Sequence, residues 1–148
     1  MQLPSRMLTE WDEEPTHEYP SLTRSRVLLA EDDPELRELV ADRLRREGCE
    51  VVTVGTGSEA LDRIAKAEAA TELDLAILDV RMPGMSGLEV VYLVRTWDLA
   101  IPLLLVTACP EPELIEECDR LRVPILQKPF PLYRIGSVAR TAMKGAEW

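Results

Sequence analysis

Cysteine and histidine are scarce in this chain. Its 148 residues include three cysteines and one histidine. The cysteines are odd in number and show no CxxC spacing, which argues against a disulfide framework and a structural zinc site and fits a reducing cytosol. The single His17 lies in a polar stretch. A histidine-based catalytic triad and a histidine-rich metal centre are therefore not supported.

Long apolar runs and positive charge are also in short supply. The longest apolar run, Ala100 to Pro110, is about half the length of a membrane-spanning helix, and residues 1–18 lack the apolar core of a secretory signal. Lys and Arg number 17 against 27 Asp and Glu, for a net charge of -10. Affinity for phosphate backbones depends on Lys and Arg. We therefore expect a cytoplasmic protein with neither a nucleic-acid nor a membrane partner.

The composition fits one globular domain preceded by a short extension. Residues 1–24 carry three prolines and five acidic residues without apolar periodicity, which predicts a flexible acidic extension. We expect the folded domain to span residues 25–145. No helix-turn-helix or basic patch follows Phe130, so we expect no output domain.

Short apolar runs alternate with helical periodicity from residue 26 onward. The predicted strands are 27–30, 50–54, 73–78, 102–106 and 123–127. The predicted helices are 34–47, 58–69, 88–97, 111–121 and 132–143. Five strands alternating with five helices predict an α/β fold, a doubly wound parallel sheet with helices on both faces. In such folds the working site lies at the carboxyl ends of the strands.

Acidic side chains, a hydroxyl and an ammonium group follow four of these strands. They are Glu31, Asp32, Asp33, Asp79, Thr107 and Lys128. Clustered carboxylates repel one another, and a divalent cation relieves that repulsion. An oxygen-only donor set without Cys or His points to Mg2+. Asp79 ends the central buried strand and can serve as a nucleophile toward phosphorus, with Lys128 and Thr107 available to phosphate oxygens.

Four segments together resemble the receiver domains of two-component response regulators. They are VLLAEDD at 27–33, LDVRMPGMSG at 78–87, IPLLLVTA at 101–108 and QKPF at 127–130. They occur in the family order, and the resemblance covers about residues 24–144. It implies a flavodoxin-like (βα)5 sheet with strand order 2-1-3-4-5.

The resemblance also implies a role for each matching position. Asp79 would accept a phosphoryl group from a sensor histidine kinase or phosphotransfer protein. Glu31, Asp32 and Asp79 would hold Mg2+ together with the backbone carbonyl of Arg81. Such a domain would catalyse only its own phosphorylation and dephosphorylation, so we do not expect an enzyme acting on external substrates.

The remaining matching positions would act on the phosphoryl group. Lys128 would contact it together with Asp79, and the Lys128-Pro129 peptide would be cis. Thr107 would bind a phosphoryl oxygen and shift inward on phosphorylation. The added charge beside a movable hydroxyl can bias a two-state surface.

Three further positions bear on how the signal is transmitted and how long the phosphoryl group lasts. The family usually has Tyr or Phe three residues before the lysine-proline pair, where this chain has Ile125. Coupling through an aromatic ring cannot operate there, so we expect the signal to travel by backbone motion of the loop after Thr107, or to travel only weakly. Arg81 and Cys109 occupy positions that often set the lifetime of the phosphoryl group, and Arg81 predicts slow self-hydrolysis. For Cys109 we favour a packed, inert thiol over a redox-sensitive one.

The sequence is compatible with three functions. The first is a stand-alone receiver, a monomer or weak dimer, that is phosphorylated at Asp79 and acts through contacts with an unidentified downstream protein. The second is a receiver-like interaction module that works without phosphorylation, a hypothesis motivated by Ile125. The third is a small Mg2+-dependent phosphatase, which Arg81 disfavours because such enzymes usually have a second acid two residues after the nucleophile.

Overall fold

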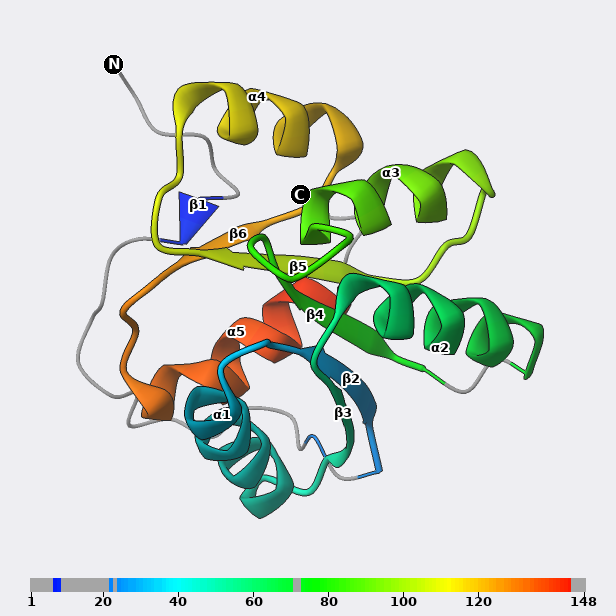
Figure 1. Ribbon diagram of the computed structural model, residues 1–148. Coiled ribbons are helices and arrows are strands. Elements are labelled where there is room, and N and C mark those ends of the chain that lie inside the picture. The colour runs from blue at the N-terminus through cyan, green and yellow to red at the C-terminus, as the bar shows by residue number, and fades with distance from the viewer. Residues whose placement is uncertain (1–6, 9–21, 23, 71–72, 145–148) are drawn as a thin grey trace.

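The structure, a computed structural model, describes residues 7–8, 22, 24–70 and 73–144. A parallel sheet runs through its centre (Figure 1). Its strands are β1 (Met7–Leu8), β2 (Arg26–Ala30), β3 (Glu50–Val54), β4 (Leu75–Asp79), β5 (Leu103–Thr107) and β6 (Ile125–Gln127). The strand order is β1-β6-β5-β4-β2-β3. Strands β2 to β6 therefore confirm the predicted 2-1-3-4-5 order.

Helices cover both faces of this sheet (Figure 1). They are α1 (Pro34–Arg46), α2 (Gly57–Ala70), α3 (Gly87–Thr96), α4 (Pro112–Leu121) and α5 (Ile135–Met143). Helices α1 and α5 pack on one face, and α2, α3 and α4 pack on the other. The observed bounds lie within two residues of those predicted, except that the first turn expected of the last helix is a 3-10 helix, η1 (Leu132–Arg134). No helix among the described residues is both long and apolar enough to cross a membrane.

The burial of the central strands explains why these strands could be predicted from the sequence. All five residues of β4 and all five of β5 are buried. Their side chains alternate between two cores: Ala76 and Leu78 face α2, α3 and α4, whereas Leu75 and Ile77 face α1 and α5. A strand covered on both faces must be apolar at every position, which produces the unbroken apolar runs seen in the sequence. Asp79 and Thr107, the polar residues that end these strands, therefore stand out.

The N-terminal segment differs from its prediction at the residues that the structure describes. Met7 and Leu8 pair in parallel with Ile125 and Leu126 of β6, and Leu22 is 2% exposed in the core beneath α1 and α5. At these three residues the structure has strand pairing and a buried side chain where the sequence predicted a flexible extension. The outer edge of β6 offers backbone donors and acceptors that a further strand can satisfy, and two residues are too few to give a periodic signal. The rest of 1–24 lies outside the described residues, apart from Arg24.

Candidate functional site

The candidate site is formed where the carboxyl ends of the strands meet. Glu31 follows β2, Asp79 ends β4, Thr107 ends β5 and Lys128 follows β6. The register aligns Asp79 with Val106, so the ends of the two central strands lie level. Parallel strands place their carboxyl ends at one edge of the sheet, and the topology alone thus gathers side chains that are up to 97 positions apart in sequence.

Lys128 joins the two buried carboxylates of the site. Its Nζ donates to Glu31 Oε1 at 2.6 Å and to Asp79 Oδ2 at 3.1 Å. The side chains of Glu31 and Asp79 are only 6% and 8% exposed. Asp32 is exposed, yet one oxygen from each of the three carboxylates lies within 4.8 Å of the others. The Lys128-Pro129 peptide bond is cis, as the resemblance implied.

Burial makes the protonation of Glu31 unusual. Desolvation, followed by the interaction with Asp79, raises the pKa of Glu31 to about 8, although Lys128 acts in the opposite direction. Burial lowers the pKa of Lys128, but its hydrogen bonds to Glu31 and Asp79 outweigh that effect and leave the pKa raised. One ammonium group thus does not fully compensate three converging carboxylates. This excess of negative charge on oxygen donors alone fits a hard divalent cation such as Mg2+.

Asp33 and Arg37 hold the loop that carries Glu31. The carboxylate of Asp33 accepts from the backbone amides of Glu35 and Leu36 and so caps α1, which keeps it out of the carboxylate cluster. Arg37 Nη1 donates to the carbonyl oxygen of Glu31 at 2.9 Å. Arg37 was not among the site residues predicted from the sequence. A cation in the first turn of a helix, where the dipole favours acids, was the signal that could have revealed it.

The backbone after β4 holds the other side of Asp79. The amide of Arg81 donates to Asp79 Oδ1 at 3.2 Å, while the residue itself is exposed. Asp79 is therefore fixed by Lys128 at one oxygen and by a main-chain donor at the other. The contact of the Arg81 carbonyl with a metal ion stays a prediction, as does the effect of its side chain on phosphoryl lifetime.

Thr107 connects the site to the loop before α4. Its hydroxyl oxygen accepts from the backbone amide of Cys109 at 3.1 Å, and its carbonyl oxygen accepts from the amide of Lys128 at 2.8 Å. Cys109 is exposed, so the prediction of a packed thiol is wrong. Ile125 is 2% exposed and lies in the core beneath α2, α3 and α4. An aliphatic side chain is thus part of the packed interior at the position where the family usually has a ring.

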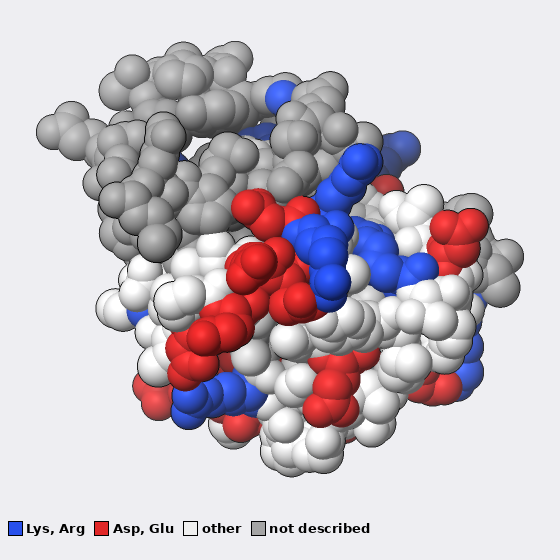
Figure 2. All heavy atoms as spheres, turned by 90° about the horizontal axis from the view of Figure 1, so that it is seen from above, with Lys and Arg blue, Asp and Glu red and all other residues white. Residues whose placement is uncertain are grey.

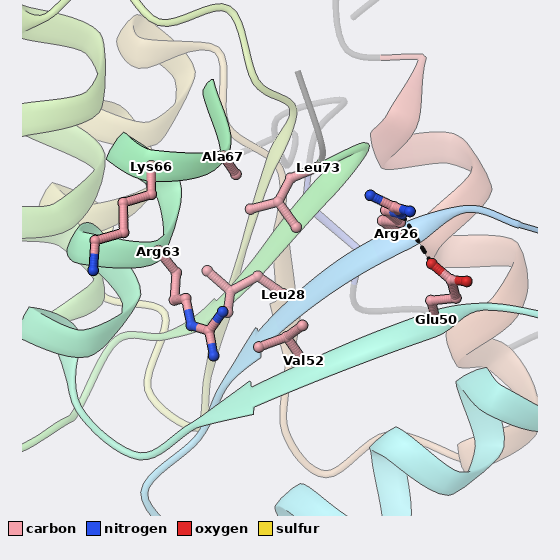
Figure 3. Close-up of a pocket in the computed structure, with 8 residues that line it drawn as sticks. All are labelled: Arg26, Leu28, Glu50, Val52, Arg63, Lys66, Ala67 and Leu73. Carbon is pink, nitrogen blue, oxygen red and sulfur yellow. Dashed lines mark hydrogen bonds and ion pairs between the residues drawn. The ribbon is translucent and has the colours of Figure 1, made fainter. Parts of the chain in front are cut away.

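A separate hollow lies at the opposite end of the strands. It has a volume of about 210 Å³ and is formed by the start of β2, the start of β3 and α2 (Figure 3). Leu28, Val52 and Leu73 give it an aliphatic lining, and an ion pair of 2.9 Å joins Arg26 and Glu50 beside it. None of the carboxylates of the candidate site lines this hollow. The clustered carboxylates and Lys128 therefore lie at the carboxyl end of the sheet, away from this hollow.

Comparison with known proteins gives a consistent family match. The family model of the response regulator receiver domain matches residues 27–140. Among solved structures, chemotaxis response regulator CheY4 of Vibrio cholerae is 31% identical, with a TM-score of 0.71 over 81% of this chain and 99% of that chain. The receiver domain of the putative response regulator NarL from Mycobacterium tuberculosis is 30% identical, with a TM-score of 0.74 over 83% and 98%.

Curated relatives are longer proteins. DNA-binding response regulator MtrA of Mycolicibacterium smegmatis is 36% identical over 85 residues, which are 57% of this chain and 35% of that protein. Transcriptional activator protein PfeR of Pseudomonas aeruginosa is 36% identical over 117 residues, 78% of this chain and 37% of that protein. The chain thus spans little more than a third of the length of these relatives.

These relatives overturn one sequence-based prediction. The acidic composition predicted that nucleic acid is not a partner, yet MtrA is named as a DNA-binding response regulator. The net charge of one domain does not predict the partners of a longer protein in which such a domain works. In MtrA, about two thirds of the length lies outside the matched segment. The acidic composition of the present chain does not predict the charge of that part.

Proposed function

Since the chain belongs to the response regulator receiver domain family, we propose that it accepts a phosphoryl group on Asp79 from a phosphohistidine of a sensor histidine kinase or phosphotransfer protein. The domain is a signalling module of two-component systems rather than a metabolic enzyme. In this proposal it catalyses only its own phosphorylation and dephosphorylation. The downstream effect named for MtrA and PfeR is DNA binding and transcriptional activation, and we propose that the receiver controls an effector of this kind.

The observation that carries the proposal is the setting of the Asp79 carboxylate. It is buried, Lys128 Nζ lies 3.1 Å from one oxygen, and the Arg81 amide lies 3.2 Å from the other. In the transfer, an Asp79 oxygen forms a bond to phosphorus as the bond from phosphorus to the histidine nitrogen breaks, and the imidazole leaves. Lys128 offsets negative charge on the phosphoryl oxygens throughout.

Glu31, Asp32 and Asp79 are the side chains that would hold Mg2+. When bound, the cation supplies positive charge to phosphoryl oxygens in a site that otherwise contains three carboxylates. Glu31 and Lys128 are already hydrogen-bonded, so Lys128 stays beside the carboxylates and aimed at the incoming group.

Thr107 would transmit the modification. Its hydroxyl oxygen now accepts from the Cys109 amide, and in the phosphorylated protein the hydroxyl would turn to donate to a phosphoryl oxygen on Asp79. Turning the hydroxyl toward the phosphoryl group removes the acceptor of that amide, which would move the loop before α4. Because Ile125 replaces the usual ring, this loop is the route we propose for the signal.

Intact mass spectrometry tests the proposal directly. The protein is incubated with acetyl phosphate and Mg2+, and we expect the mass of one phosphoryl group to be added. Asp79→Asn should abolish the addition. Asp62→Asn, which changes an exposed aspartate paired with Lys66 on α2, should leave it intact. Modification of Asp79→Asn to the same extent as the wild type would refute the assignment.

A phosphorylation-independent interaction module is the second candidate, favoured by the burial of Ile125. Hydrogen exchange of the phosphorylated protein separates the two functions. A signalling receiver should show altered exchange at Cys109 and in the first turn of α4. Stoichiometric phosphorylation with unchanged exchange throughout the domain would favour the module.

A further inference from the structure

We propose that the groove between α3 and α4 is a docking site for a basic, amphipathic peptide segment of a partner protein, and that phosphorylation of Asp79 changes its affinity. The docking site is inferred from the groove itself. The coupling rests on the function proposed above.

The groove has a volume of about 310 Å³ and combines an aliphatic floor with a rim on which three glutamates outnumber one arginine. Its lining residues are Val80, Arg81, Leu88, Thr107, Cys109, Glu111, Glu113, Leu114 and Glu117. Val80, Leu88 and Leu114 are all half-buried and packed against the core, so they present apolar surface to an occupant. Apolar side chains of a peptide would gain free energy by covering this surface.

The rim determines the charge of the occupant. Glu117 already accepts from Tyr92 and pairs with Arg120. Glu111 and Glu113 are exposed, and neither has an ion pair within the part of the chain that the structure describes. Figure 2 shows a band of acidic side chains on the face that carries α3 and α4. Lys and Arg of a partner complement this rim.

The neighbouring edge of the sheet is less accessible. Strand β1 pairs with β6, the strand that lies beside α4 at that end of the sheet. Ile125 in β6 is buried and offers no side chain to a partner. The α3–α4 groove, lined by Leu88 of α3 and Leu114 of α4, is in contrast a concave surface that an occupant can reach.

The groove also contains the residues next to the proposed phosphorylation site. Val80 and Arg81 directly follow Asp79, and Thr107 and Cys109 share the hydrogen bond that we expect phosphorylation to break. We expect an occupant that contacts these residues to bind one arrangement of the loop better than the other. By linkage, phosphorylation and docking then alter each other.

Fluorescence anisotropy with a labelled synthetic peptide tests docking. The probe is an amphipathic helix of Leu and Lys, and its matched control replaces every Lys with Glu. We expect only the Lys peptide to bind. Glu113→Lys should weaken this binding about tenfold, equivalent to about 1.4 kcal/mol. Glu38→Lys makes the same charge change on α1, across the sheet, and should leave the affinity unchanged. No binding of the Lys peptide, or equal binding to both variants, would overturn the docking site.

The coupling is tested in the same assay with acetyl phosphate and Mg2+, with intact mass recorded on each sample. We expect at least a threefold change in affinity that is absent from Asp79→Asn. A full mass shift with unchanged affinity would overturn the coupling. Absence of the mass shift would refute the proposed function instead, and the docking site would still be decided by the comparison of Glu113→Lys with Glu38→Lys.

Discussion

The affinity of the site for Mg2+ should depend on pH through Glu31. In the metal-free protein, burial raises the pKa of this carboxyl to about 8. A carboxylate must lose its proton before it can serve as a ligand, so protons compete with the metal. Protonation of Glu31 weakens the Mg2+ affinity by a factor of one plus ten to the power of pKa minus pH. This factor is roughly 100 at pH 6, 10 at pH 7 and 2 at pH 8. The dissociation constant should therefore fall about tenfold from pH 6 to pH 7 and about fivefold from pH 7 to pH 8.

Amide chemical shifts around Asp32, followed by NMR during Mg2+ titrations at the three pH values, measure these constants. Calorimetry in two buffers of different ionisation enthalpy measures the protons released, which should be close to one per Mg2+ at pH 7, since Glu31 is then roughly 90% protonated. Glu31→Gln removes the titrating group and should flatten the pH dependence. An affinity that is constant from pH 6 to pH 8 in the wild type, with no proton release, would refute the reasoning.

Three further predictions concern stability and reactivity. The folded-state pKa of Glu31 lies above its ordinary value of 4.5, so the folded state binds this proton more tightly than the unfolded state. Metal-free stability, measured by urea unfolding, should fall as pH rises from 6 to 8. Burial raises the pKa of Cys49 to about 11 and that of Cys118 to about 12. Iodoacetamide should therefore label only the exposed Cys109 of the native protein. Mass spectrometry of the labelled protein would reveal any second labelled cysteine. Gly87→Ala places a Cβ 2.3 Å from the carbonyl oxygen of Asp79, which ends β4. The free energy of unfolding, measured in urea, should fall by about 1–3 kcal/mol.

The sequence predicted the fold well because its determinants are periodic. The buried strands β4 and β5 are unbroken apolar runs, and α1 begins at Pro34 directly after the capping Asp33. The site was predictable for a related reason. Asp79 and Thr107 are polar residues that end apolar strands, and the topology decides that such ends converge.

Features without a periodic signal escaped the prediction. Strand β1 has two residues and depends on an edge of β6 that forms only in the folded sheet. Arg37 acts through a hydrogen bond to the backbone of Glu31, six positions earlier. Cys109 was expected to be a packed thiol, but its position in the loop after β5 leaves it exposed. Each of these depends on tertiary geometry rather than on local pattern.

Strand β1 also bears on self-association of the protein. An uncovered sheet edge is a template onto which a second molecule can add its own strand, and natural proteins protect such edges with short strands or side chains. β1 covers β6 and, with two residues, is itself too short to be a strong template. At the other edge, Arg45 Nη2 donates to the carbonyl oxygen of Val51 in β3 at 3.4 Å. Loss of Met7 and Leu8 would leave the edge of β6 unpaired, and we expect this to favour concentration-dependent aggregation.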